Sequence, residues 1–353
     1  MVGRWTRGVA IVSAVIAAVA LAIGCAKERE INPKPVDYTL LVADPVALSV
    51  FYIDPKTYTV VDSLWSIGSM FEPSISPDGR WIYLSTEFDG FRHTPGLYKF
   101  DLDTKQHTSF LGTPAGFLSR GEFALVADGG LLIEGFDSLN LISPEDLTIT
   151  GSRPIRLSTP HGARGSDLVV GGAFGNYLSF YLGIYDYRRS TFDSILVGSN
   201  GYVYESYIHP DGRRVFVWDG NVLSVVDLLT RSVTRRPGVM GGTVHVVFDR
   251  SGDRAFVAYG HSWGIDGPCP EGKVWVIDCT RADYPIVDSL IFPGQEARSV
   301  ALSPDETRLY IGLEINSCQL GRILVVNPDS LADSLGAITH GTINNPEWLL
   351  IRE

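Results

Sequence analysis

One hairpin pattern, repeated along most of the chain, constrains the fold more than any other feature of this sequence. Each copy consists of an apolar run, a turn of the Pro-Asp-Gly type and a second apolar run. The copies are SISPDGRWIYLS (74–85), YIHPDGRRVFVW (207–218), VFDRSGDRAFVA (247–258), ALSPDETRLYIG (301–312) and the weaker ALVADGGLLIE (124–134). Proline presets φ, aspartate hydrogen-bonds its own backbone and glycine accepts a positive φ, so these turns favour tight β-hairpins.

Two further apolar runs follow each hairpin. The third usually ends in aspartate, as in GLYKFD (96–101) and KVWVID (273–278). The fourth often carries Asp-Ser-Leu or Asp-Ser-Ile, at residues 62–64, 193–195, 288–290 and 333–335. Apolar positions alternate with period two, which indicates strands and not helices. Four short strands in a unit of roughly 40 to 54 residues are typical of a propeller blade.

Six complete units can be counted, and they cover residues 70–113, 114–157, 158–198, 199–238, 239–293 and 294–340. Two fragments remain. Residues 38–67 match the second, third and fourth strands of a unit, and the C-terminal PEWLLIRE matches a first strand. We therefore predict an all-β fold, a seven-bladed β-propeller closed by the C-terminal strand joining the N-terminal blade. Closure of this kind removes the open edges of the ring.

The Ser-Pro-Asp-Gly hairpins followed by apolar strands resemble the YVTN-type propeller repeats of bacterial and archaeal surface proteins. The resemblance covers residues 38–353 and implies a propeller architecture. It implies little about activity, because the motif residues form turns and cores. Binding scaffolds, lactonases and dehydrogenases share this architecture, so function has to be argued from a site.

The first 24 residues have the composition of a secretory signal peptide. The apolar segment Gly8–Gly24 is preceded by Arg4 and Arg7, and a polar stretch follows it at once. Its end, Leu21-Ala22-Ile23-Gly24-Cys25, resembles a bacterial lipobox, which implies lipidation of Cys25 as the first mature residue. The alternative is a single membrane-spanning anchor, for which 17 apolar residues are barely long enough.

This reading divides the chain into a lipoprotein signal peptide (1–24), a tether (25–37) and the propeller domain (38–353). Ala26 follows the cysteine where an aspartate would indicate inner-membrane retention, so we expect a cell-envelope protein attached to the outer membrane. Removing residues 1–24 takes away two arginines and no acid, so the net charge falls from −11 to −13. A negative surface repels phosphate backbones, and nucleic acid is not expected as a partner.

Three cysteines follow Cys25. Cys269 and Cys318 lie in equivalent second-to-third-strand loops of adjacent units, which emerge on the same face of a propeller. We predict a Cys269–Cys318 disulfide, since export permits pairing. Cys279 ends a third strand, about 20 Å of strand away from the Cys269 loop, and is expected to be free. The alternative is three unpaired thiols.

One set of residues could form a site on the propeller axis. Glu72, Glu122 and Glu205 stand six residues before the turn aspartates, and His245 and Glu347 take the equivalent place in two other units. This position begins the innermost strand, so the side chains would ring the axial mouth. Carboxylate oxygens suit Ca²⁺ or a similar divalent cation. Alternatively, these glutamates bond the neighbouring blade's backbone or pair with Arg120 or Arg298.

No nucleophile elbow, phosphate-binding loop, HExxH or CxxCH motif occurs in the chain, and no organic cofactor is predicted. Loops expected on one face carry aromatic and histidine residues, including Phe91, His93, His261 and Trp263. Our first hypothesis is a non-enzymatic binding module that presents this loop face to a protein, peptide or glycan partner. The alternative is a lactonase-like propeller hydrolase with a divalent cation at the axial mouth.

Overall fold

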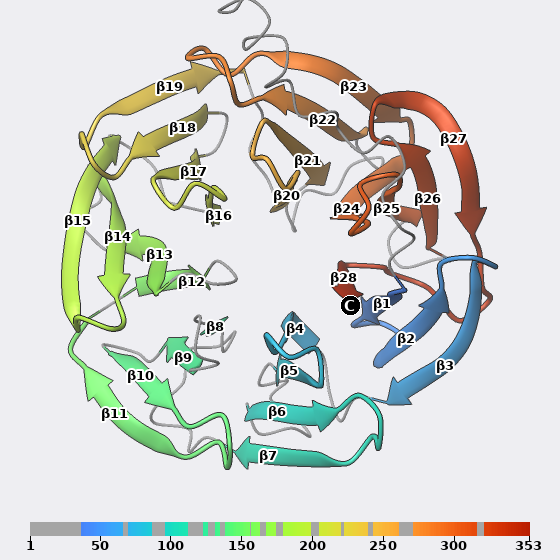
Figure 1. Ribbon diagram of the computed structural model, residues 1–353, viewed down its shortest axis with the longest axis horizontal. Coiled ribbons are helices and arrows are strands. Elements are labelled where there is room, and N and C mark those ends of the chain that lie inside the picture. The colour runs from blue at the N-terminus through green and yellow to red at the C-terminus, as the bar shows by residue number, and fades with distance from the viewer. Residues whose placement is uncertain are drawn as a thin grey trace, which may run out of the picture. The chain divides into compact units, whose positions relative to one another are not determined.

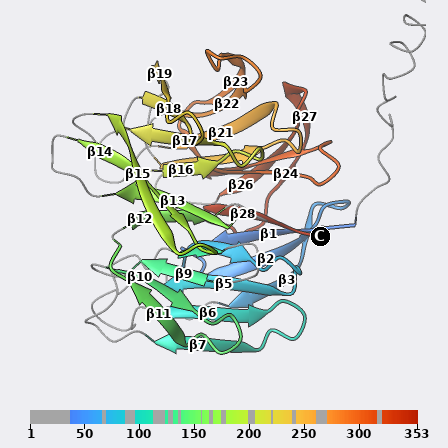
Figure 2. The same cartoon turned by 60° about the vertical axis from the view of Figure 1, so that its left-hand side comes forward.

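The computed structural model describes residues 37–65, 70–86, 96–111, 123–125, 131–134, 138–155, 157–162, 167–173, 179–198, 205–219, 222–238, 243–260, 271–315 and 321–353. These ranges form seven antiparallel sheets of four strands each, arranged around a central axis (Figure 1). The architecture is an all-β, seven-bladed β-propeller, which confirms the predicted fold class. Figure 2 shows the blades from the side, with the strands of each blade running between the two faces of the ring.

The blades are named here in chain order. Blade 1 contains β4 (Met70–Ile75), β5 (Trp81–Thr86), β6 (Gly96–Asp101) and β7 (His107–Leu111). Blade 2 contains β8 (Phe123–Leu125), β9 (Leu131–Glu134), β10 (Leu139–Ile142) and β11 (Ile149–Arg153). Blade 3 contains β12 (Leu157–Gly162), β13 (Leu168–Ala173), β14 (Phe180–Asp186) and β15 (Thr191–Gly198).

Blade 4 contains β16 (Glu205–Ile208), β17 (Arg214–Asp219), β18 (Val222–Asp227) and β19 (Val233–Pro237). Blade 5 contains β20 (Thr243–Phe248), β21 (Arg254–Gly260), β22 (Gly272–Asp278) and β23 (Ile286–Phe292). Blade 6 contains β24 (Gln295–Leu302), β25 (Leu309–Ile315), β26 (Arg322–Asn327) and β27 (Ser330–Ile338). The predicted units match these blades, except that β12 begins one residue earlier than the third unit.

Blade 7 joins the two ends of the described chain. The C-terminal strand β28 (Trp348–Arg352) pairs with β1 (Thr39–Asp44), which is followed by β2 (Ser49–Asp54) and β3 (Thr59–Trp65). The register places Leu40 opposite Ile351 and Ala43 opposite Trp348. The predicted closure by the C-terminal strand is therefore confirmed.

The two faces of the ring can be distinguished by the direction of the inner strands. Inner strands begin at one end of the axis, here called the mouth face, and finish at the other, here called the turn face, in turns such as Ser76–Gly79. Thr39 pairs with Arg352, and Arg352 in turn donates to the Gly79 carbonyl at 2.9 Å. The described chain therefore enters the propeller on the turn face.

The aspartates that end the third strands organise the next turn. The Asp101 carboxylate accepts the N–H groups of Asp103 and Thr104 at 2.9 and 2.8 Å. The turn then closes at Lys105, whose φ is 60° and whose N–H donates to the Asp101 carbonyl at 2.8 Å. Asp227 does the same for its own turn. A side-chain acceptor for two otherwise unpaired N–H groups explains the recurring aspartate.

The Asp-Ser signature of the outer strands also has a physical role. The carboxylates of Asp62, Asp193 and Asp288 accept the N–H of the serine that follows, at 2.8, 2.7 and 2.7 Å. Each also reaches the next blade, through Lys105, Arg231 and the Leu331 N–H respectively. The signature therefore covers N–H groups of an outermost strand and links consecutive blades.

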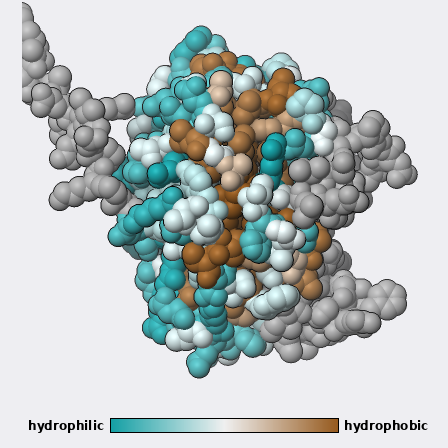
Figure 3. All heavy atoms as spheres, turned by 90° about the vertical axis from the view of Figure 1, so that its right-hand side faces the viewer, coloured by the Kyte–Doolittle hydropathy of each residue, from teal (hydrophilic) through white to brown (hydrophobic). Residues whose placement is uncertain are grey.

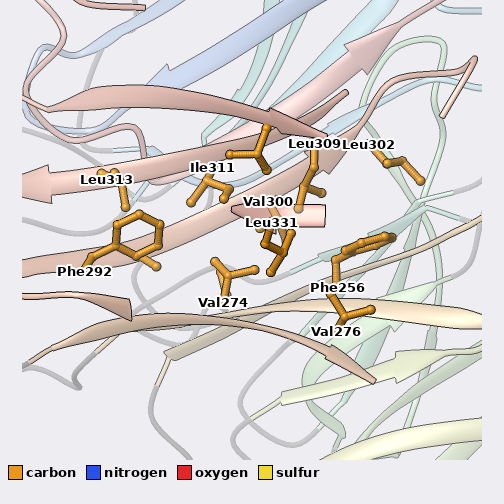
Figure 4. Packing of buried hydrophobic residues seen from close by; sticks show 13 residues of the cluster. Phe256, Val274, Val276, Phe292, Val300, Leu302, Leu309, Ile311, Leu313 and Leu331 are labelled. Atoms are coloured by element: carbon orange, nitrogen blue, oxygen red, sulfur yellow. The ribbon is translucent and has the colours of Figure 1, made fainter. Parts of the chain in front are cut away.

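Hydrophobic cores lie between neighbouring blades. Figure 4 shows one of them, where Phe256, Val274 and Val276 of blade 5 pack against residues of blade 6 such as Ile311 and Leu313. Because every blade presents apolar side chains to both neighbours, the ring holds together by sheet-on-sheet packing. The inner strands are thereby held in fixed positions around the axis.

Candidate functional site

A polar and aromatic cluster lies where the inner strands of three consecutive blades approach one another. It consists of His161 on β12, Glu205 and Tyr207 on β16, and His245 on β20. Glu205 is the first residue of its strand and His245 the third, so both stand toward the mouth face. We call these four residues the axial cluster.

Local backbone geometry places His161 in the cluster. The pairing of β12 with β13 shifts register between Ser158 and His161, and regular pairing resumes with His161 opposite Val170. Such a bulge changes the direction of the side chains beside it. Tyr207 stands two residues after Glu205 on β16, and alternation along a strand puts both on the same side of the sheet.

The contacts within the axial cluster are close. His161 Nε2 lies 2.9 Å from a Glu205 carboxylate oxygen, and the two side chains are 20% and 17% exposed. The His161 ring stacks on Tyr207 with centroids 5.1 Å apart and an interplanar angle of 25°. Tyr207 meets His245 edge to face at 6.3 Å and the buried Trp218 at 6.2 Å. The Tyr207 ring therefore connects the two imidazoles.

His245 is held in its neutral form. Burial, followed by the proximity of His161, lowers the pKa of His245 to about 4. The Val300 N–H donates to Nδ1 at 3.4 Å. Since Nδ1 accepts this hydrogen, the proton of the neutral ring is on Nε2. At neutral pH His245 can thus donate one hydrogen bond without carrying charge.

A second polar group lies in blade 6. Arg298 is 8% exposed and occupies a β-bulge of β24, where the register with β25 shifts between Ala297 and Ser299. Its guanidinium lies 2.7 Å from Glu296 and 2.6 Å from Glu314. Burial alone would lower the pKa of Arg298, but Glu314, Glu296 and Glu347 together raise it. Arg298 thus compensates two carboxylates that stand opposite each other on neighbouring strands.

The structure brings together some of the predicted site residues and not others. Glu205 contacts His161 and His245 meets the Tyr207 ring, whereas Glu347 immediately precedes β28 and helps to raise the pKa of Arg298. Glu72 belongs to β4. Glu122 lies outside the described residues. Among the residues that the structure describes, no group of three or more His, Cys, Asp or Glu side chains is arranged to hold a metal ion.

Several other predicted residues cannot be placed. Cys25, Cys269 and Cys318, and the loop residues Phe91, His93, His261 and Trp263, lie outside the described ranges. The disulfide and the lipidation site stay predictions. Cys279 is a free and buried thiol whose pKa burial raises to about 12. The described part of the chain contains no helix with the length and apolar character needed to cross a bilayer.

Sequence reasoning missed His161 and Tyr207 as members of the site. Tyr207 is part of the repeated hairpin and looks like a core residue. His161 precedes a degenerate turn, and a bulge decides its direction. The available signal was Pro160, directly before His161, because a proline inside a strand favours a bulge. The cluster offers a carboxylate, two imidazoles and a phenol beside aromatic surface, which suits hydrogen bonding combined with ring stacking.

Neither a family model nor a curated relative matches the chain. Solved structures, however, are similar to it. A functionally unknown protein from Desulfotomaculum acetoxidans is similar over 89% of this chain and 99% of its own, with 13% identity and a TM-score of 0.63. Hydrazine synthase of Kuenenia stuttgartiensis is similar over 84% and 98%, with 13% identity and a TM-score of 0.62. Dihydro-heme d1 dehydrogenase NirN is similar over 90% and 77%, with 15% identity and a TM-score of 0.55. At these identities the likeness shows the fold, a β-propeller.

Proposed function

We propose that this chain is an exported, lipid-anchored β-propeller of the YVTN-repeat type, which binds a protein, peptide or glycan partner at its mouth face. Lipidated Cys25 attaches it to the membrane of the cell envelope, on the outer-membrane side. The proposal rests on the lipobox-like sequence at Leu21–Cys25 and on the distribution of groups over the two faces of the ring.

The observation that carries the proposal is the position of the chain's entry. Asp37 lies on the turn face, where its carboxylate binds the Lys56 ammonium at 2.7 Å beside the turn before β3. Glu205 and His245 of the axial cluster stand toward the opposite face. An anchor that attaches on one face leaves the other accessible, so a partner can approach His161, Glu205 and Tyr207 without displacing the tether.

The axial cluster has the chemistry of a recognition site. Aromatic rings with a polar group at one edge provide contact area at low entropic cost, and they are enriched in binding hot spots. His161 and Glu205 are already joined by a hydrogen bond, so they need little reorganisation before binding. Peptides and sugars both present the donors, acceptors and apolar faces that this arrangement complements.

Photo-crosslinking in intact cells tests the binding role. A benzophenone amino acid at Tyr207 should give covalent adducts, because the group inserts into C–H bonds of either a peptide or a sugar. The same amino acid at the exposed Thr57 on the turn face is the matched control and should give none. Absence of adducts at Tyr207, or equal adducts at both positions, would contradict recognition at the mouth face.

The alternative is a lactonase-like hydrolase that holds a divalent cation at the axial mouth. It draws support from the contacts of Glu205 with His161 and of His245 with Tyr207, because both predicted residues belong to the axial cluster. Metal analysis of the purified protein separates the two functions. One equivalent of Ca²⁺, Mn²⁺ or Zn²⁺ that is lost in Glu205→Gln would favour the hydrolase. A protein without metal, whose melting temperature does not respond to chelator, would favour the binding module.

The anchor has its own test. Cells fed a labelled fatty acid should incorporate label into the wild-type chain and not into Cys25→Ala. Label in both chains, or in neither, would contradict lipidation at this residue.

A further inference from the structure

Five large apolar side chains are exposed on the outermost strands of three consecutive blades. Val61 and Trp65 on β3 are 61% and 73% exposed, Leu335 on β27 is 47% exposed, and Val287 and Ile291 on β23 are 55% and 49% exposed. We call these five residues the rim patch. Figure 3 shows the side of the ring that bears β27 and β3, with hydrophobic atoms gathered in a band across it.

The three strands form one continuous side of the ring. The Leu331 N–H at the start of β27 donates to the Asp288 carboxylate of β23 at 3.1 Å. Farther along β27, Gly336 lies against the ring of Tyr58, the residue before β3, and a Cβ at that glycine would come within 2.9 Å of the ring. The rim patch therefore extends over neighbouring strands on one side of the molecule.

Two acidic residues next to apolar side chains of the rim patch already have partners. Asp62, next to Val61, binds the Lys105 ammonium and the Ser63 N–H. Asp288, next to Val287, accepts the N–H groups of Ser289 and Leu331. Hydrogen-bonded carboxylates cost less to bring near an apolar phase than free ones. The five residues of the patch include no lysine or arginine, which suits a zwitterionic lipid surface better than an anionic one.

The tether ends beside this patch. Asp37 pairs with Lys56 in the turn that leads directly into β3. The residues from Cys25 to Val36 can span at most about 40 Å when fully extended. An acyl chain on Cys25 would therefore hold β3 within reach of the bilayer at a high effective concentration, so that even a weak apolar contact is occupied.

We propose that the rim patch rests on the lipid surface and seats the propeller edge-on against the membrane. Trp65 lies at the polar–apolar boundary, where tryptophan is favoured, and Val61, Leu335 and Ile291 contact the acyl region beside it. The ring then stands with its axis along the membrane plane and its mouth face unobstructed. This inference rests on the lipid anchor of the proposed function.

Fluorescence quenching by brominated lipid tests the seating in the full, lipidated chain. The protein is reconstituted in phosphatidylcholine vesicles with bromine on the acyl chains close to the headgroups. Wild-type emission should be quenched, and Trp65→Phe should lose most of that quenching. The matched control adds Leu196→Trp to Trp65→Phe. Leu196 follows Asp193 by three residues as Trp65 follows Asp62, is 53% exposed, and lies on β15 across the ring (Figure 1). This tryptophan should not be quenched.

Each of the following outcomes would contradict the contact of the rim patch with the lipid surface. Equal quenching of Trp65 and of a tryptophan at 196 would show contact without orientation. No quenching of an anchored, acylated protein would refute the rim contact and leave the anchor intact. A chain that lacks the acyl group and stays in the aqueous fraction would refute both. Trp65 shielded from aqueous acrylamide in cell envelopes, yet unquenched in pure lipid vesicles, would show that a protein covers the rim instead.

Discussion

Asp44 accepts hydrogen bonds from both ends of the described chain. It is fully buried at the end of β1, and its carboxylate accepts the N–H groups of Val46 and Ala47 at 3.0 and 2.8 Å. The N–H groups of Asn344 and Asn345, just before the C-terminal strand, donate to its other oxygen at 2.6 and 2.9 Å. One side chain thus fixes the segment that closes the ring.

Asp44→Ala should therefore destabilise the protein strongly. Four N–H groups lose their acceptor in a buried place, and we expect a loss of about 3 kcal/mol in the free energy of unfolding. Chemical denaturation measures this change. The matched variant is Asp54→Ala, at the equivalent end of β2, whose carboxylate serves only its own exposed turn. Equal losses in the two variants would contradict a closing role for Asp44.

His245 should stay neutral in mildly acidic solution. Its pKa is lowered to about 4 from 6.5, first by burial and then by His161. An unfolded chain takes up this proton near pH 6.5 and the folded chain does not, so His245 removes stability as the pH falls from 6.5 toward 4. Nitrogen NMR of the ring should report a midpoint near 4, and His161→Gln should move it upward. A midpoint near 6.5 in the wild type would contradict this lowering of the pKa.

At the scale of elements, the segment before β28 depends on two glycines. A Cβ at Gly312 would lie 2.4 Å from both the Pro346 carbonyl oxygen and the Ser299 hydroxyl, and one at Gly321 would lie 2.4 Å from Pro346 Cδ. The Ser299 hydroxyl donates to that same carbonyl at 2.7 Å. Gly312 and Gly321 of blade 6 therefore leave the space in which the segment before β28 packs.

Gly312→Ala should displace the segment before β28. We expect the free energy of unfolding to fall by about 1–3 kcal/mol because of overpacking. Gly341→Ala is the matched control, since nothing lies within 4 Å of a Cβ at that position. It should change the stability by less than about 0.5 kcal/mol. Thermal denaturation of both variants checks the difference. A Gly312→Ala protein as stable as the wild type would show that Pro346 can move without cost.

The strands of the inner ring were predicted from the sequence, but their bulges were not. Their hairpins and order followed from turn chemistry. The bulges in β4 and β12 contain Pro73 and Pro160, and a proline inside a strand favours a bulge, whereas the bulge in β24 contains no proline or glycine. Two of these bulges set the directions of His161 and Arg298. Of the repeated glutamates, Glu205 begins β16, Glu72 is the third residue of β4 and Glu347 precedes β28, and the partner of Glu205 comes from a neighbouring blade.

For the whole molecule, ionised aspartates in the turns should set the acid limit of stability. The Thr104 N–H and other donors lower the pKa of Asp101 to about 2. Burial tends to raise the pKa of Asp211, but the N–H groups of Arg214 and Arg213 lower it to about 2. Groups with depressed pKa values contribute stability above pH 3.8 and lose it as the pH falls toward 2. The melting temperature should therefore drop steeply over this window.

A chain that ends before β28 should not form a stable ring. Without residues 344–353, β1 would expose an unpaired edge and Asp44 would lose two of its donors. We expect such a protein to aggregate or to unfold well below the melting temperature of the full chain. Size-exclusion chromatography and circular dichroism check this. A monomeric, fully folded truncated protein would show that six blades and three strands suffice.

The sequence by itself determined the blade: turn residues specify hairpins, alternation specifies strands, and the leftover terminal fragments specify closure. These signals are local, so they can be read in chain order. The axial cluster and the rim patch were decided only by the tertiary structure. His161, Tyr207 and His245 come from three blades, as do Trp65, Leu335 and Ile291, and packing between sheets sets their distances. Distances between side chains that belong to different blades leave no pattern in the linear sequence.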